Sequence, residues 1–468
     1  MARRVPLTAA AVAAAMGGRL RSGDPDRVID GFAIDSRTLA AGDLFFAIAA
    51  ARDGHDFVAD ALARGAAGAV VSRAVTGVDE GPGGPVLVEV ADTTRALQDL
   101  ARHVRRASGA TVVAITGSAG KTTTKEAIAA LVSARHTVVK NQGNLNNHLG
   151  LPLSLLELRH GADVAVMELG MNHAGEIRTL VSIAEPEWRV WTNVGEAHLG
   201  NFGSPEGIAD AKAEILEGAS AADRLVANAD DPRVMARAAR FAGQVVTFGT
   251  AEGAAVRATA IQARGLAGTR ATVGTPAGTA AIEVPLLGRG NLANVLAAMA
   301  VAIGMDVPLG EIAGRVSRLE PPLHRGAVRR LGKGVTLVDD CYNSSPSALA
   351  RALEVIAAET GCARRAAVLG EMLELGEQSA ALHRQAGRAA AAAGLARLVT
   401  VGGAPARALG EAAVAAGLAP GAVSHAATSA EAAGIIAGWL APGDLVLVKG
   451  SRGIRTDAVV DRIEAEFA

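Results

Sequence analysis

The feature that most constrains this chain is a short glycine loop between an apolar stretch and an alanine-rich segment, Thr116-Gly-Ser-Ala-Gly-Lys-Thr-Thr123. The apolar stretch Thr111–Ile115 predicts a strand, and the segment after the loop predicts a helix. A strand, a glycine turn and a helix N-terminus gather backbone N–H groups around one point, and this geometry holds phosphate. The loop therefore predicts an α/β domain that binds a nucleotide.

The polar residues of this loop have separate expected roles. Lys121 is placed to reach the outer phosphates, and the Thr122 hydroxyl is placed to ligate Mg²⁺. The loop is shorter than the common G-x-x-x-x-G-K-[ST] pattern, because Ile115 stands where the first glycine belongs. A glycine-rich turn without a ligand is the alternative, and the Gly-Lys-Thr-Thr run disfavours it. The predicted nucleotide loop consists of Gly117, Ser118, Ala119, Gly120, Lys121, Thr122 and Thr123.

Length and composition limit the class of protein. A chain of 468 residues predicts about three domains, and 50% hydrophobic residues allow large cores. A net charge of -1 predicts no attraction to nucleic acid or to an anionic membrane, and no segment has the ~20 apolar residues that cross a bilayer. Cys341 and Cys362 lack metal or disulfide spacing, which predicts a reducing, cytoplasmic location. Residues 1–16 superficially resemble a signal peptide, but a short helix capped by Thr8 is favoured.

The hydrophobic pattern divides the chain into three α/β domains. Residues 1–87 predict a small α/β domain, 88–318 a central parallel-sheet domain, and 319–468 a second doubly wound, Rossmann-like sheet. Short alternating strands between Val245 and Leu287 predict an antiparallel excursion on the central domain. Strands are expected at Gly31–Ser36, Asp43–Ile48, Gly68–Val71, Thr111–Ile115, Asp163–Leu169, Trp188–Val194, Arg224–Ala227, Val245–Phe248, Ala255–Ala260, Ala271–Val273, Ala281–Leu286, Val335–Asp339, Ala366–Leu369, Leu398–Val401 and Leu445–Val448.

Polar residues stand at the carboxyl ends of several central strands, where ligands of open parallel sheets bind. Glu168 ends one strand and His198 follows the next, so together with Thr122 they form a candidate Mg²⁺ site. The alternatives are a helix cap for Glu168 and a backbone-bonded loop residue for His198. Lys212 is one of only six lysines, which argues against a solvated helix lysine paired with Glu214 or Glu217. The other interpretation left open is a carbamate formed with CO₂ near the metal, which requires a depressed amine pKa.

Asparagine-rich and basic segments supply further candidates. Gly143–Pro152 holds asparagines suited either to turns and caps or to a ligand, and Asn291 and Asn294 begin an apolar helix, where they either cap it or read an adenine. In the third domain, Arg325 is placed to reach a phosphate. The strand ending Asp339-Asp340-Cys-Tyr-Asn343 precedes a helix opened by proline, which indicates a site rather than a simple turn. The loop Lys449-Gly-Ser451-Arg452-Gly453 suits a carboxylate or phosphate.

These motifs together resemble the Mur ligases, the ATP-dependent amide-forming family of peptidoglycan synthesis. The resemblance covers essentially the whole chain. It includes Glu168-Leu-Gly-Met-Asn172, Thr192-Asn-Val-Gly-Glu-Ala-His198, Ala211-Lys212-Ala-Glu and Asp339-Asp-Cys-Tyr-Asn-Ser-Ser-Pro346. The Asp-Asp-x-Tyr-Asn run discriminates most, because members that add a single amino acid usually show Asp-Tyr-Ala-His-x-Pro there. It implies a member that joins D-alanyl-D-alanine to UDP-N-acetylmuramoyl-tripeptide.

The resemblance implies roles for the candidate residues, with ATP and Mg²⁺ as ligands and a monomer as the expected state. The implied catalytic residues are Lys121, Glu168, His198 and Lys212, and the metal ligands are Thr122, Glu168, His198 and a carbamylated Lys212. Besides the loop, the implied ATP contacts are Asn291, Asn294, Arg325 and Asp340. The implied substrate contacts are Ser36, Arg37, Asn146, Asn343, Lys449, Ser451 and Arg452.

One position departs from the family pattern, and rival functions stay open. The family usually has His before the first of the two asparagines, and this chain has Gly290. A ligase that adds one amino acid, a folate polyglutamate-type ligase, a P-loop kinase or NTPase, and an inactive nucleotide-binding scaffold are the alternatives. The Asp-Asp-x-Tyr-Asn run, the third domain and the retained Lys121, Glu168, His198 and Lys212 disfavour them.

Overall fold

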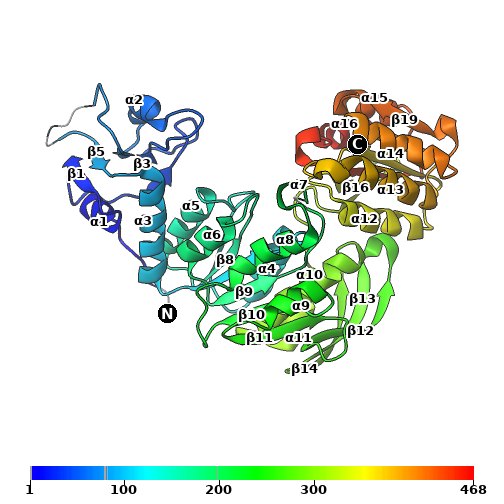
Figure 1. The fold of residues 1–468 in the computed structure, drawn as a ribbon, viewed down its shortest axis with the longest axis horizontal. Helices are drawn as coiled ribbons and strands as arrows, with labels where there is room; N and C mark the ends of the chain where they lie inside the picture. The colour runs from blue at the N-terminus through cyan, green and yellow to red at the C-terminus, as the bar shows by residue number, and fades with distance from the viewer. Residues whose placement is uncertain (1–2, 79–80, 82, 198) are drawn as a thin grey trace. The chain divides into compact units, whose positions relative to one another are not determined.

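Three sheets organise the chain in the computed structural model (Figure 1), which describes residues 3–78, 81, 83–197 and 199–468. The chain forms two compact units. The first comprises Met1–Ile115, Arg135–Arg189 and Glu214–Arg224, and the second comprises Thr116–Ala134, Val190–Ala213 and Leu225–Ala468. The mixed α/β architecture expected from the sequence is confirmed. No helix of the described residues is long and apolar enough to cross a membrane.

The N-terminal sheet has the strand order β1-β5-β4-β3-β2. Its strands are parallel except for β1, which pairs antiparallel with β5. The predicted domain limit after residue 87 falls inside β5, so this sheet continues to Glu89. The elements are α1 (Ala9–Ala15), β1 (Arg19–Ser22), β2 (Gly31–Ala33), β3 (Asp43–Phe46), α2 (Val58–Ala63), β4 (Gly68–Val71), β5 (Val86–Glu89) and α3 (Thr93–Ser108).

The second sheet has nine strands in the order β14-β13-β12-β11-β10-β9-β6-β8-β7. Strands β8 and β9 are buried along their whole length, as expected where helices cover both faces of a parallel sheet. The strands are β6 (Thr111–Thr116), β7 (Val138–Lys140), β8 (Val164–Glu168), β9 (Trp188–Trp191), β10 (Arg224–Asn228), β11 (Gln244–Gly249), β12 (Val256–Ala263), β13 (Thr269–Thr275) and β14 (Gly278–Val284). The helices are α4 (Lys121–Val132), α5 (Gly150–Leu156), α6 (Glu176–Ala184), α7 (Leu199–Phe202), α8 (Pro205–Ala213), α9 (Pro232–Ala238), α10 (Gly288–Gly304) and α11 (Leu309–Val316).

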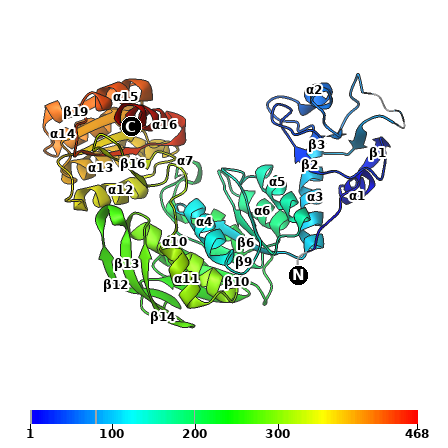
Figure 2. The ribbon, with the colours of Figure 1, turned by 180° about the vertical axis from the view of Figure 1, so that it is seen from behind.

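The antiparallel excursion is confirmed, with one correction. Strands β12, β13 and β14 pair antiparallel, and α10 and α11 pack beside them (Figure 2). Strand β11, which we expected to belong to the excursion, pairs parallel with β12 instead. The alternation of apolar residues indicates that one face is exposed but not which way a neighbouring strand runs, so the sequence pattern could not separate the two.

The C-terminal sheet has the strand order β15-β16-β20-β17-β18-β19, and only the edge strand β15 is antiparallel. Alternate residues of its strands enter two separate cores, one against α15 and α16 and the other against α12, α13 and α14 (Figure 1). This is the doubly wound arrangement that the repeated strand and helix pattern predicts. The elements are β15 (Ala327–Arg330), β16 (Thr336–Asp340), α12 (Pro346–Ala358), β17 (Arg365–Gly370), α13 (Ser379–Ala392), β18 (Arg397–Val401), α14 (Ala404–Ala415), β19 (Val423–Ala426), α15 (Ser429–Ala437), β20 (Leu445–Lys449) and α16 (Asp457–Phe467).

Candidate active site

The glycine loop joins β6 to α4, and two of its glycines are required by the backbone. Gly117 and Gly120 have φ angles of +151° and +84°, which favour glycine. A β-carbon on Gly117 would lie 1.9 Å from Thr192 Oγ1, and one on Gly120 would lie 2.2 Å from Asn294 Oδ1. The loop is therefore closed in by neighbouring polar side chains and has no room for any other residue at these two positions.

The two residues after β9 hold the loop in shape. Ala119 N–H donates to Asn193 Oδ1 at 2.9 Å, and Asn193 Nδ2 donates back to Ala119 O at 3.0 Å. Thr192 Oγ1 donates to the same carbonyl at 2.7 Å, and Ser118 N–H donates to Asn193 O at 3.0 Å. Because the amides of Ser118 and Ala119 are used internally, these two predicted ATP contacts act here as supports of the loop. Sequence reasoning placed Asn193 only at a strand end and missed this supporting role.

Two lysines, Lys121 and Lys212, belong to the candidate site, and their surroundings differ. Lys121 Nζ donates to Gly117 O at 2.9 Å, so its side chain folds back over the loop. Lys212, on α8, is 1% exposed, and burial together with the charge of Lys121 lowers the pKa of its amine well below the ordinary value. A buried amine with a depressed pKa is neutral over a wide pH range, which is the form that reacts with CO₂.

Glu168 and Asn146 meet at the end of β8. Asn146 Nδ2 donates to Glu168 Oε1 at 3.0 Å. Glu168 is buried, with only 4% of its surface exposed. The pairing of β6 with β8 places Glu168 opposite Ile115, the residue before the glycine loop begins. The alternative role of Glu168 as a helix cap is wrong, because α6 begins at Glu176 with Gly175 as its N-cap.

The asparagine-rich segment contains one asparagine that caps a helix and another that contacts a candidate metal ligand. Asn147 Oδ1 accepts from Gly150 N–H at 2.8 Å and so caps α5, which is the turn and cap chemistry. Asn146 instead faces the Glu168 carboxylate, which is a position for a ligand contact. Sequence alone could not tell which asparagine would do which, because the choice depends on where β8 ends.

Asn291 and Asn294 lie on the first turns of α10. Asn294 is 6% exposed, lies against Gly120 of the glycine loop, and donates through Nδ2 to Asn291 Oδ1 at 2.9 Å. Asn291 Nδ2 donates to Leu287 O, so its amide does not cap the helix N–H groups. The interpretation of these residues as caps is therefore wrong, and the pair borders the nucleotide loop. His198, the remaining metal candidate, lies outside the described residues.

In the C-terminal domain, two of the predicted substrate contacts, Lys449 and Ser451, form hydrogen bonds within the protein. Lys449 is 3% exposed, and its Nζ donates to Asp340 Oδ2 at 2.6 Å and to Asn343 O at 3.0 Å. Ser451 Oγ accepts from Leu373 N–H at 3.0 Å. The guanidinium of Arg325 stacks on the Tyr342 ring at 4.0 Å, and that of Arg452 lies 5.5 Å from the same ring.

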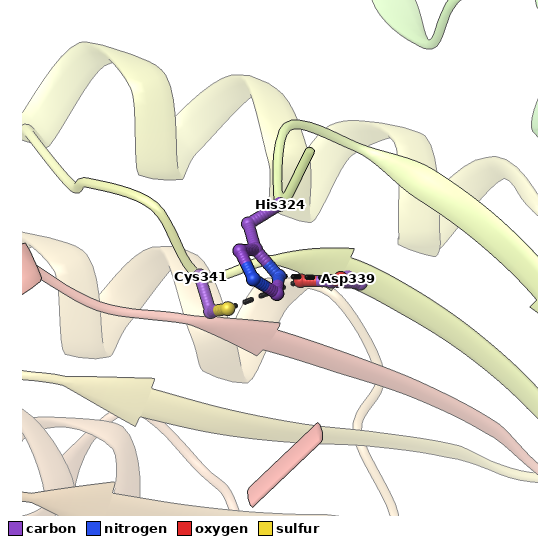
Figure 3. A group of neighbouring side chains, drawn as sticks. All are labelled: His324, Asp339 and Cys341. Carbon is purple, nitrogen blue, oxygen red and sulfur yellow. Dashed lines mark hydrogen bonds and ion pairs between the residues drawn. The ribbon is translucent and has the colours of Figure 1, made fainter. Parts of the chain in front are cut away.

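A cluster of His324, Asp339 and Cys341, which sequence reasoning missed, lies in the C-terminal domain (Figure 3). His324 Nδ1 lies 2.8 Å from Asp339 Oδ2, Cys341 Sγ donates to Asp339 Oδ1 at 3.1 Å, and Arg329 Nη2 donates to Oδ2 at 3.0 Å. Burial and the Asp339 carboxylate raise the pKa of the Cys341 thiol, which keeps it protonated. Three side chains, one of them the cationic Arg329, contact the Asp339 carboxylate, so the cluster is a buried hydrogen-bond network that needs no ion.

Ser36 and Arg37, two of the substrate contacts that the family resemblance implies, lie in the first unit, after β2. Arg37 forms a bidentate pair with Asp35, through bonds of 2.9 and 2.6 Å, and this guanidinium holds the pKa of the Asp35 carboxyl far below its usual range. Ser36 is buried at 6% exposure, while Arg37 is exposed. Arg37 is therefore the member of the pair that is presented to solvent.

Comparison with known proteins decides the family. Family models match residues 28–105 (Mur ligase family, catalytic domain), 115–302 (Mur ligase middle domain) and 324–452 (Mur ligase, glutamate ligase domain). The chain belongs to the Mur ligase family. The resemblance found in its motifs is thereby confirmed, and the kinase and scaffold alternatives lose their support.

Individual relatives narrow the similarity within this family. The chain is 35% identical to the UDP-N-acetylmuramoyl-tripeptide–D-alanyl-D-alanine ligase of Mycobacterium bovis, over 99% of this chain and 98% of the relative. The crystal structure of MurF from Acinetobacter baumannii matches with a TM-score of 0.86 and 31% identity, covering 99% of both chains. MurF ligase of Thermotoga maritima in complex with ADP matches with a TM-score of 0.80 and 30% identity, over 94% of this chain and 98% of that one.

Proposed function

We propose that this Mur ligase joins D-alanyl-D-alanine to UDP-N-acetylmuramoyl-tripeptide, with ATP converted to ADP and phosphate. The observation that carries the proposal is the end-to-end similarity to relatives named for this reaction. The Asp339-Asp-Cys-Tyr-Asn343 run and the Gly117–Thr123 loop supply the matching local chemistry.

The reaction proceeds in two steps. A carboxylate oxygen of the tripeptide substrate attacks the γ-phosphorus of ATP, and ADP leaves, which gives an acyl phosphate. The neutral amine of the dipeptide then attacks the acyl carbon, phosphate leaves, and the nitrogen loses a proton to form the amide. The first step brings two anions together, so Lys121 and the N-terminus of α4 offset their repulsion.

The proposed metal ligands suit a hard cation. Thr122, Glu168, His198 and a carbamate on Lys212 would supply mainly oxygen ligands for Mg²⁺, which when bound neutralises phosphate charge. The Asn146 amide orients the Glu168 carboxylate, as the hydrogen-bonded neighbours of metal ligands commonly do. Among these residues, Lys212 is the one whose role requires a covalent change.

Carbamylation of Lys212 follows from its buried, neutral amine. The amine nitrogen attacks the carbon of CO₂, one proton leaves to solvent, and the product is an anion that attracts Lys121 where the ammonium form would repel it. Carbon-13 NMR of the protein in labelled bicarbonate should show a carbamate signal that is missing in Lys212→Arg. A spectrum without that signal in the parent protein would exclude the modification.

The test of the reaction is phosphate release from ATP with UDP-N-acetylmuramoyl-tripeptide, in the presence and absence of D-alanyl-D-alanine. Release that requires both substrates, with a pentapeptide product by mass spectrometry, is the expected result. Release that responds to a single amino acid and not to the dipeptide would assign a sister activity. Release that needs neither substrate would leave only an NTPase.

A further inference from the structure

Gly290, where the family usually has a histidine, borders a space that a distant side chain occupies. A β-carbon built on Gly290 would lie 3.3 Å from Arg351 Nε and 3.6 Å from its Cδ. Arg351 belongs to α12 of the C-terminal sheet, while Gly290 begins α10. The side chain of Arg351 therefore passes directly beside the position that lacks a side chain in this chain.

Arg351 is a half-buried cation whose guanidinium has no direct partner among the residues that the structure describes. Within the described part of the chain, its guanidinium makes neither a hydrogen bond nor an ion pair. Burial lowers the pKa of Arg351, while the carboxylates of Glu196, Glu354 and Asp340 act in the opposite direction from a distance. A guanidinium stays protonated in such surroundings, so it is a buried charge that a bound anion could satisfy.

Contacts connect this guanidinium to the nucleotide loop in two steps. Asn294 lies against Gly120 of the loop and donates to Asn291, the residue directly after Gly290. Among the carboxylates that act on Arg351, Asp340 is also a predicted ATP contact. Arg351 thus stands at the loop's border, on the side where the two asparagines lie.

Glu196 adds a second unsatisfied group at the same place. Its Oε2 atom is buried and has no hydrogen-bond partner among the residues that the structure describes. A buried carboxylate oxygen and a half-buried guanidinium, each without a direct partner among the described residues, have hydrogen-bonding capacity that a bound ligand could satisfy. The simplest alternative is that Arg351 is a solvent-exposed residue of its helix without a ligand. This alternative does not explain why its side chain lies partly buried beside Gly290.

We propose that Arg351 is a further nucleotide-binding residue. Its side chain occupies the space beside Gly290, and from there its guanidinium pairs with the polyphosphate of ATP. The proposal rests on the proposed function, because it needs ATP in the Gly117–Thr123 loop. A guanidinium forms charge-assisted bonds to phosphate oxygens, and these bonds are about twice as strong as neutral ones. Arg351 supplies this charge from the C-terminal domain, in the same way as is predicted for Arg325.

Steady-state kinetics of Arg351→Ala and Arg351→Lys test the proposal, with exposed Arg384→Ala on α13 as the matched control. Arg351→Ala should raise the KM for ATP about 10- to 100-fold, while the KM values of both peptide substrates stay within about twofold. Arg351→Lys should recover part of the loss, because lysine also binds phosphate as a point charge. An unchanged KM for ATP, or equal changes in all three KM values, would overturn the proposal.

A second pair of variants tests whether Gly290 and Arg351 share one space. Gly290→Leu should raise the KM for ATP in the parent protein and add little in the Arg351→Ala background, because the displaced side chain is already gone. Effects that multiply would show that the two positions act separately, against the proposal.

Calorimetric titration with ADP keeps the test decisive for a variant without turnover. Arg351→Ala should bind ADP about 10-fold or more weakly than the parent protein, at an unchanged melting temperature. If the parent protein ligates its substrates and Arg351→Ala binds ADP normally, only this inference fails. If the parent protein shows no ATP-dependent ligation, the proposed function fails first.

Discussion

Two loops of this ligase are built alike, yet their lysines have opposite uses. Each loop follows a buried parallel strand and contains glycine, lysine and a hydroxyl: Gly117–Thr123 after β6 and Lys449–Gly453 after β20. Lys121 bonds to a carbonyl of its own loop, whereas Lys449 is buried in an ion pair with Asp340. A lysine that bonds to a carbonyl of its own loop can turn to a phosphate, while Lys449, which pairs with the partly buried Asp340 carboxylate, links strands β20 and β16.

The largest expected effect separates the two loops by activity. Lys121→Ala should lower ATP turnover about 10³-fold, because the charge that offsets phosphate repulsion is lost. Its melting temperature should stay near that of the parent protein, because Lys121 is only partly buried and its bond to Gly117 O is local to the loop. Phosphate release and thermal unfolding measure the two effects, and exposed Lys333→Ala is the control. Normal turnover in Lys121→Ala would contradict the claim that Lys121, unlike Lys449, acts on the phosphates of ATP.

The second-largest effect is expected from a substitution of Gly120 in the first loop. Gly120→Ala adds a β-carbon 2.2 Å from Asn294 Oδ1 at φ +84°, so we expect turnover to fall about 10²-fold and the free energy of unfolding to fall by about 2 kcal/mol. Gly253, at φ +82° with nothing within 4 Å of the added atom, isolates the backbone strain. Gly253→Ala should lose only about 1 kcal/mol in denaturant melts and keep its activity. Equal losses would show that Asn294 does not confine the loop.

Lys449→Met should have its main effect on stability. The substitution leaves the Asp340 carboxylate without its partner and frees the Asn343 carbonyl, so the free energy of unfolding should fall by about 2 kcal/mol. Urea denaturation measures it, and Lys333→Met on the surface should stay within about 0.5 kcal/mol. If Lys449→Met kept full stability but lost dipeptide binding, Lys449 would be the substrate contact expected from sequence.

Lys212 sharpens the comparison, because it is buried like Lys449 but its amine pKa is lowered. The unfolded chain binds a proton to this lysine where the folded state does not, so in carbonate-free buffer stability should rise with pH up to the ordinary lysine pKa. Lys212→Met should flatten that slope and raise stability by about 1 kcal/mol, while turnover is lost. Melting temperatures between pH 6 and 10 measure the slope. An identical slope in the variant would show that Lys212 is not the titrating group.

The predicted strands, the glycine loop and the family emerged from local patterns and were confirmed. Thr111–Ile115 and Leu445–Val448 are strands because both faces of a parallel sheet are buried, which a short apolar run already indicates. The edge strands β1, β15 and β19 were missed, since short edge strands carry a weak pattern. The parallel pairing of β11 with β12 depends on neighbours that the local pattern does not contain.

The candidate site divides in the same way. Lys121, Glu168 and Asn294 were found because their residue types stand next to a strand end or a helix start. The roles of Asn193 as a support of the loop, of Asp339 as the centre of a buried network, and of Arg351 beside Gly290 were not visible. Each depends on a partner far along the chain, and nothing in the local sequence names that partner.

Short-range spacing and the periodicity of buried residues already specify the glycine loop, the α/β layers and the family. The state of each charge emerges only once the chain has folded. Lys449 is paired with a carboxylate 109 residues away, Lys212 is enclosed without a carboxylate partner among the residues that the structure describes, and Arg351 lies beside a glycine of another helix. Desolvation and charge pairing depend on which residues meet in space, and folding alone sets that.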